Sequence, residues 1–310
     1  MSSLLRRVSD SLFHVYQRRD LSRWEHQPLI RRPIYGVYHV YCARGWQGLV
    51  SAQLKRLRES GLLDASSKLY VSIIAPDKKD VGAFLRIADS DKVELVAVHE
   101  DPSRYEYPAL EYLANVAKRE DCLLYYFHTK GISYQGVGIN DRLYRSFSRK
   151  IEAWREMLEY FVFAKWQVAV NVLDEGYDTY GCYQWPPKGY TMFSGNFWWV
   201  SSDYARRLPA FTPQAISGNR FYSEVWLYQL PHRTFSAFET IADLYFVRIY
   251  PPPIRRFPPL FLEGPLAIRA NLQLAQVIEA RRHQLQATLP TSFPAVSHRQ
   301  YPITLTPWRH

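Results

Sequence analysis

Between residues 34 and 131, short apolar runs alternate with segments of helical pattern. The apolar runs are IYGVYHVYC, KLYVSIIAP, KVELVAVHE and CLLYYFHTKG. The segments between them are WQGLVSAQLKRLRESG, with a glycine stop at Gly61, then KDVGAFLRIA, and YPALEYLANVAKRED, with Pro108 in its first turn. Strands that alternate with helices form βαβ units. The alternation therefore predicts an α/β fold with a mainly parallel central sheet flanked by helices.

Behind Gly131 the pattern changes. A glycine-bearing loop precedes a long helical pattern over 141–176, which we expect to form two helices. Strands are predicted in YDTYGCYQW and in GYTMFSGNFWWVSS, and short helices in DYARRLP and RFYSEVWLYQLP. The piece TFSAFET is expected to be extended or helical. We expect three parts: a basic N-terminal extension over 1–33, an α/β domain over 34–250, and a Pro-rich segment, helix and loose tail over 251–310, so that extra helices lie at both termini.

The net charge indicates which kind of partner the protein binds, and the cysteines indicate the compartment in which it folds. The 310 residues carry a formal net charge of +10, which favours an anionic partner such as a phosphorylated substrate, a lipid head group or a nucleic acid. Three widely spaced cysteines, Cys42, Cys122 and Cys182, argue against a disulfide framework and a zinc site and fit a reducing cytosol. The sequence contains neither a long apolar span nor a secretory signal, so we expect a cytoplasmic protein.

The N-terminal extension offers two readings. Its apolar residues could form one helical face with arginines beside it, which would suit contact with the inner face of a membrane. The alternative, which we favour, is that this segment packs on the domain or stays loose.

His128, Thr129, Lys130 and Gly131 follow the apolar run LLYYF directly. Ligands of α/β proteins bind beyond the carboxyl ends of such strands. Histidine and lysine supply positive charge there, threonine a hydroxyl, and glycine room for a phosphate near the backbone. The alternative is a strand-end histidine with internal partners and a solvated lysine.

The strand end FHTKG, followed later by SGNFWW, resembles the GT-A fold of nucleotide-sugar glycosyltransferases. It is also similar to bacterial and viral polysaccharide-assembly proteins that carry both motifs. The resemblance spans roughly residues 34–250. It implies a nucleotide-sugar donor, a glycan or lipid-linked hydroxyl acceptor, and a role in building polysaccharide or another glycan.

One feature departs from that family. Many GT-A enzymes carry Asp-x-Asp at this strand end to hold a divalent metal, whereas this chain has His128-Thr129-Lys130. We therefore expect no metal ligands here and no certain cofactor, with Mn²⁺ or Mg²⁺ held elsewhere as the open alternative. His128 and Lys130 are predicted to share a strand face and to stabilise the diphosphate leaving group.

The resemblance implies further donor contacts at neighbouring strand ends. His39, Tyr41 and Arg44 follow the first strand and are expected near the nucleotide. Glu100 and Asp101 follow the third strand and are expected at the base or ribose, although Asp101 before Pro102 equally suits a turn.

Acceptor chemistry is predicted in the rear half of the domain. Glu224, among aromatic residues, is the expected general base of an inverting transfer, with a structural pairing to Arg220 as its alternative. Asp203 competes for the role but also suits a helix N-cap. Asn196 and Trp198 are predicted acceptor or sugar contacts, and only one of Trp198 and Trp199 can face a site on a strand.

Two other function classes remain as alternatives. A non-catalytic sugar- or nucleotide-binding subunit would explain the missing Asp-x-Asp. A nucleic-acid-binding protein would explain the positive charge and aromatic content, but the sequence has no helix-turn-helix, zinc or RNA-recognition motif, so no nucleic-acid partner is expected.

Overall fold

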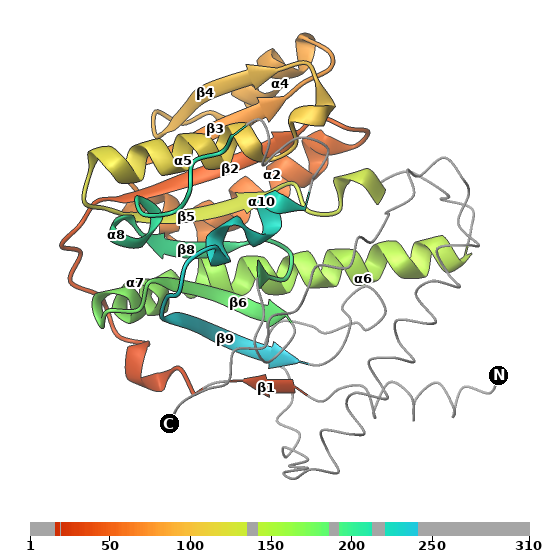
Figure 1. Ribbon diagram of the computed structural model, residues 1–310. Helices are drawn as coiled ribbons and strands as arrows, with labels where there is room; N and C mark the ends of the chain where they lie inside the picture. Colours follow the sequence, from red (N-terminus) through yellow and green to blue (C-terminus); the bar gives the residue numbers. More distant parts are fainter. Residues whose placement is uncertain (1–15, 19, 135–141, 186–191, 213–220, 241–310) are drawn as a thin grey trace, which may run out of the picture. The chain divides into compact units, whose positions relative to one another are not determined.

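The computed structural model describes residues 16–18, 20–134, 142–185, 192–212 and 221–240 (Figure 1). Contacts divide the chain into two compact units, 1–257 and 258–310. Residues 241–310, which include the Pro-rich segment and helix expected after residue 251 and the whole second unit, lie outside the described residues. The following account concerns the first unit.

The front half forms the predicted parallel sheet. Its strands are β2 (Ile34–Tyr41), β3 (Lys68–Ile74), β4 (Val93–His99) and β5 (Leu123–His128). Its helices are α2 (Trp46–Glu59), α3 (Leu62–Ala65), α4 (Lys79–Ala88), the 3₁₀ turn η2 (Pro102–Arg104) and α5 (Tyr107–Arg119). The α/β class predicted from the alternating pattern is confirmed.

The rear half adds antiparallel pairs. Its strands are β6 (Thr179–Trp185), β7 (Met192–Phe193), β8 (Trp198–Ser201) and β9 (Thr234–Thr240), and the N-terminal β1 (Tyr16–Arg18) pairs with β9. The single strand expected in GYTMFSGNFWWVSS is wrong, because a turn at Gly195, with φ of +91°, separates β7 from β8. Both short strands pair antiparallel with β6.

The helices of the rear half are α6 (Arg142–Glu159), the π-helical turn Tyr160–Ala164, α7 (Trp166–Asp174), α8 (Ser202–Ala205), α10 (Tyr222–Val225) and the 3₁₀ turn η5 (Trp226–Tyr228). The two helices predicted over 141–176 are thus confirmed, with the π-helical turn between them. Within the described ranges, no helix combines the length and apolar character needed to cross a membrane.

The strand order creates a switch point in the sheet. Along the nine-stranded sheet the order is β1, β9, β6, β8, β5, β2, β3 and β4, with β7 paired to β6 (Figure 1). The chain runs outward from β2 through β3 to β4 and then returns to the other side of β2 to form β5. In open α/β sheets, ligands bind in the crevice that opens where the order reverses. The carboxyl ends of β2 and β5 mark that position here.

The sheet is covered on both faces. On one face, called the α2 face below, Tyr38, Tyr125 and Trp199 pack with side chains of α2, α6 and α7. On the opposite face, called the α5 face, Tyr126 and Trp198 pack with side chains of α5, α8 and η5. Central strands buried on both faces explain the near-continuous apolar runs in the sequence.

The segment before β2 packs on the domain. Leu21 is buried, and the side-chain amide of Asn171 in α7 donates to the backbone carbonyl of Trp24 at 2.9 Å. Lys165 pairs with Glu25 at 2.6 Å. The described residues from 20 to 33 therefore follow the packing alternative, while residues 1–15, where most of the membrane-surface helix was expected, lie outside the described residues.

Candidate functional site

Two histidines stand side by side at the switch point. His39 near the end of β2 is the register partner of His128 at the end of β5. Side chains alternate along a strand, so both share the α5 face with Tyr126. Thr129 ties the two strand ends together, because its hydroxyl oxygen accepts from the Tyr41 amide at 3.0 Å and its amide donates to the His39 carbonyl at 3.1 Å.

Glu106, at the N-terminal end of α5, connects three elements of this site. Its Oε2 accepts hydrogen bonds from the Tyr126 hydroxyl at 2.8 Å and from the Asn196 side-chain amide at 2.6 Å. Its Oε1 lies 3.6 Å from Nδ1 of His128. Burial works against the charged carboxyl, but the neighbouring histidines and the two donors together hold the pKa of Glu106 below its usual value. Glu106 is therefore an ionised carboxylate at the centre of a polar cluster.

Both ring nitrogens of His128 have neighbours within the protein. Nε2 lies 3.0 Å from the Gly195 carbonyl, which can only accept, so this nitrogen carries a proton. Nδ1 faces Glu106. Burial lowers the pKa of His128, and the Glu106 charge counteracts part of that effect. The ring is thus held between the β7–β8 turn and α5, which revises the expectation that it reaches a leaving phosphate directly.

His39 lies deeper in the same cluster. Its side chain is buried, and Nδ1 has no hydrogen-bond partner among the described residues. Burial lowers the pKa of His39 to about 4, with the charge of Glu106 opposing the shift. His39 is therefore neutral at pH 7 and belongs to the interior of the site.

A buried ionic cluster supports the strand end from the α2 face. Gln53 of α2 is fully buried, and its amide donates to the His128 carbonyl at 3.1 Å and to Glu159 at 3.0 Å. Arg56 and Arg155 form ion pairs with Glu159. Arg155 also donates to the Lys130 carbonyl at 3.4 Å. These contacts fix the backbone that presents residues 128–130.

Lys130 and Gly131 leave the strand geometry. The ammonium group of Lys130 lies 4.1 Å from the ring centroid of Trp154 in α6, a cation–π geometry. Gly131 has φ of +85°, and a Cβ there would lie 2.4 Å from Ile151 Cγ2. Because β5 ends at His128, strand alternation does not apply beyond it. His128 turns toward Glu106 whereas Lys130 turns toward Trp154, so the predicted common strand face does not describe them.

Asn196 and Trp198 contribute in different ways. Asn196 has φ of +56°, is buried, and accepts from the Trp198 indole at 2.7 Å while donating to Glu106. Trp198 and Trp199 lie on opposite faces of β8, as alternation predicts, yet both have 0% exposure. The expectation that Trp198 touches a sugar is corrected: the sheet is covered on both faces, so Trp198 contacts the cluster from within the core, through Asn196 and through the Tyr126 ring at a centroid distance of 5.0 Å.

Glu224 approaches the cluster from α10. Burial raises the pKa of Tyr126 well above 10, and the charges of Glu106 and Glu224 add to the rise. Asp203 lies in the first turn of α8, whose N-cap is Ser201, and it pairs with Arg206 at 3.6 Å. Arg220, the alternative partner of Glu224, is outside the described residues.

The remaining predicted donor contacts are more exposed. Tyr41 is half-buried and Arg44 is exposed in the loop after β2. Glu100 pairs with Lys78 at 3.1 Å on the surface. Asp101 accepts from the amide and hydroxyl of Ser103, which follows the turn alternative for this residue.

Sequence reasoning missed Glu106 and Gln53. Glu106 stands one residue before the predicted helix start at Tyr107, at the carboxyl end of the sheet, and this placement could have identified it. Gln53 lies inside the apolar stripe of α2, where a fully buried amide requires partners. Among the residues that the structure describes, no three His, Cys, Asp or Glu side chains converge closely enough to hold a metal ion.

Comparison with solved structures gives distant likenesses. No family model and no curated protein matches the sequence. A solved structure described as a nucleotide-diphospho-sugar transferase from Desulfovibrio desulfuricans G20 is 12% identical, with a TM-score of 0.32 over 63% of this chain and 72% of that chain. 4-Diphosphocytidyl-2C-methyl-D-erythritol synthase from Anaerococcus prevotii DSM 20548 is 6% identical, with a TM-score of 0.36 over 71% of this chain and 94% of that chain. The chemistry of the site must therefore be argued from this chain's own residues.

Proposed function

We propose that this protein is a glycosyltransferase that takes a sugar from a nucleotide-diphosphate donor and transfers it to a hydroxyl acceptor. The observation that carries the proposal is the polar cluster at the switch point of the sheet. The carboxylate network of Glu106 lies there, at the carboxyl ends of β2 and β5, and Lys130 and Gly131, a glycine with positive φ, follow β5 directly. This is the position at which α/β sheets bind ligands.

The leaving diphosphate needs a fixed positive charge. Negative charge develops on it as the anomeric bond breaks, and preorganised cations stabilise that charge most effectively. Lys130 is the candidate cation, because Trp154 and the supported strand end restrict its position. His128 acts through the elements it holds, Glu106 and the Gly195 turn, rather than by its own contact with the phosphate.

The acceptor hydroxyl needs a proton acceptor in an inverting transfer. Glu224 is the candidate, since it lies on α10 and its charge adds to the raised pKa of Tyr126, a member of the cluster. Asn196 is the candidate sugar contact through its place beside Glu106. Tyr41, Arg44, Glu100 and Thr129 stay candidate donor contacts. A lipid-linked or glycan acceptor and polysaccharide assembly rest on the motif resemblance alone, and contact with a membrane surface rests on the basic N-terminal extension.

A panel of nucleotide sugars tests the proposal. Thermal unfolding is followed with each uridine, guanosine, cytidine and thymidine diphosphate sugar, because a ligand that binds only the folded state raises the melting temperature. We expect a rise with at least one donor, and slow release of its nucleoside diphosphate. A rise without release, with and without candidate acceptors, would instead indicate a non-catalytic binding subunit. No rise with any donor would contradict the proposal.

A further inference from the structure

Tyr105 combines an unusual backbone conformation with an unusual exposure. Its φ of +46° and ψ of −140° lie in a region that residues other than glycine rarely occupy. Its side chain is 39% exposed, and among the large hydrophobic residues exposed in the described ranges it is the only aromatic one. No described ring stacks on it. A glycine would fit this backbone better, so the conformation itself does not explain a tyrosine at this position.

The backbone holds Tyr105 rigidly from both sides. Ahead of it, the Asp101 side chain caps the η2 turn by accepting from the Ser103 amide at 2.8 Å, and the Tyr105 amide donates to the Pro102 carbonyl at 3.2 Å. Behind it, the Glu106 carbonyl accepts from the Leu110 amide at 3.1 Å as α5 begins. The ring is therefore carried by a preorganised segment and not by a loose loop.

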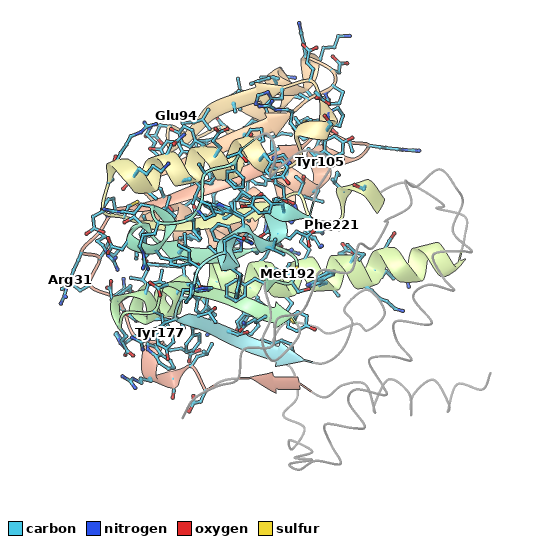
Figure 2. All side chains as sticks on the ribbon, in the orientation of Figure 1. Arg31, Glu94, Tyr105, Tyr177, Met192 and Phe221 are labelled. Atoms are coloured by element: carbon cyan, nitrogen blue, oxygen red, sulfur yellow. The ribbon has the colours of Figure 1, made fainter. Side chains whose placement is uncertain are left out.

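The position of Tyr105 relates it to the proposed donor site. It directly precedes Glu106, the centre of the polar cluster, and it follows β4, the third strand of the parallel half. Figure 2 shows Tyr105 and Phe221 at the same end of the sheet, the end at which β2 and β5 finish. A ligand whose diphosphate lies at β5 can extend across the ends of β2 and β3 toward β4, three strand spacings of about 4.8 Å each.

We propose that the exposed ring of Tyr105 is the stacking platform for the nucleobase of the donor. This inference rests on the proposed function and adds one contact to it. A flat aromatic face stacks on any base, and a tyrosine side chain has only two χ angles to fix when the base arrives. The strained backbone is then the cost of presenting the ring in the stacking orientation.

Replacing Tyr105 with glycine tests the contribution of the ring separately from that of the backbone strain. Tyr105→Gly removes the ring but suits the positive φ, so we expect the melting temperature not to fall. Affinity for the nucleoside diphosphate, measured by calorimetry with the tightest of uridine, guanosine, cytidine and thymidine diphosphates, should drop by about fivefold or more. Tyr105→Phe keeps the ring and should bind within about twofold of the wild type.

Asp89→Gly is the matched control. Asp89 also has positive φ, +32°, but it is an exposed residue at the C-cap of α4 and belongs to none of the contacts of the site. Its replacement likewise changes a residue with positive φ, at ψ of +61° rather than −140°, and removes no contact of the site, so nucleotide affinity should stay unchanged. If Tyr105→Gly is less stable than the wild type, Tyr105→Asn, which also tolerates positive φ, is measured in its place and should show the same loss of affinity.

Three results would overturn the inference while leaving the proposed function standing. Tyr105→Gly and Tyr105→Asn could bind the nucleoside diphosphate as tightly as the wild type does. The loss could appear only with the nucleotide sugar and not with the nucleoside diphosphate, which would place the ring against the sugar. Tyr105→Phe could bind as weakly as the glycine variant, which would assign the contact to the hydroxyl. Failure of the wild type to bind any nucleotide would instead contradict the proposed function.

Discussion

Oε1 of Glu106 faces Nδ1 of His128 across 3.6 Å, and this contact joins the N-terminal end of α5 to the carboxyl end of β5. The same carboxylate accepts from Tyr126 and Asn196 through its other oxygen. One side chain thus fixes a helix end, a strand end and the β7–β8 turn. The arrangement of the whole polar cluster depends on it.

Removing the Glu106 carboxylate should destabilise the fold, whereas replacing it with an amide should not. Glu106→Ala leaves the Tyr126 hydroxyl and the Asn196 amide without their acceptor, which should lower the free energy of unfolding by about 2–3 kcal/mol. Glu106→Gln keeps an acceptor oxygen for both donors and should stay within about 1 kcal/mol of the wild type. Urea unfolding measures both variants. Glu111→Ala, an exposed position on the same helix, is the control; equal stability of Glu106→Ala and Glu111→Ala would contradict the network.

Acid should weaken the fold through His39. Its pKa is about 4 in the folded protein, compared with an ordinary value of 6.5, so between these values the unfolded chain binds the additional proton. Stability therefore rises with pH across this window, and the contribution of His39 is lost as pH falls from 6.5 to 4, on the order of 3 kcal/mol in total.

The pH dependence is checked by urea unfolding at several pH values between 4 and 7. His39→Gln should flatten the slope, because the remaining histidines titrate in both proteins and cancel in the comparison. An unchanged slope in His39→Gln would show that His39 takes up its proton equally in the folded and unfolded chains.

Two glycine-to-alanine changes should have opposite effects. At Gly131 a Cβ would meet Ile151 Cγ2 at 2.4 Å and φ is +85°, so Gly131→Ala should cost roughly 1–3 kcal/mol. At Gly48, in α2, a Cβ would meet nothing within 4 Å, so Gly48→Ala should stabilise by about 0.5–1 kcal/mol. Thermal unfolding of the Gly131→Ala and Gly48→Ala variants measures both effects. A Gly131→Ala variant more stable than the wild type would contradict the described backbone after β5.

The two glutamates that pair with Arg56 should differ in their contribution to the stability of the fold. Glu159 is 1% exposed in its side chain and also holds Arg155 and Gln53, so Glu159→Ala leaves buried positive charge uncompensated and should cost about 3–5 kcal/mol. Glu156 is 31% exposed, and Glu156→Ala should cost about 1 kcal/mol or less. Denaturant unfolding of both variants gives the comparison, and similar losses would count against a buried supporting cluster.

The periodic front half of the fold was predictable, but the β7–β8 region was not. Strands β2 to β5 and helices α2, α4 and α5 follow apolar periodicity and helix stop residues closely. The turn at Gly195 interrupts an apolar run, and only tertiary pairing of both flanking pieces with β6 shows the break. The burial of both Trp198 and Trp199 likewise depends on helices from distant parts of the chain.

At the site, the sequence showed which residues end the strand, but not which residues they contact. His128 and Lys130 stand where the apolar run ends, which the sequence makes visible. Their different orientations follow from the backbone after β5 and from Trp154 and Gly195, which are distant in sequence. The contacts of Glu106 with Tyr126 and Asn196 could not be predicted, because these residues come together only in three dimensions.

Calorimetric titration with a nucleoside diphosphate in the presence of EDTA tests the central claim most directly. Fixed positive charge from Lys130 should hold the diphosphate without a metal ion, so wild-type protein should bind and Lys130→Ala should bind about 10- to 100-fold more weakly. Lys118→Ala, an exposed lysine on α5, should bind as the wild type does. Equal affinity of wild type and Lys130→Ala, or binding that disappears with EDTA, would contradict the claim.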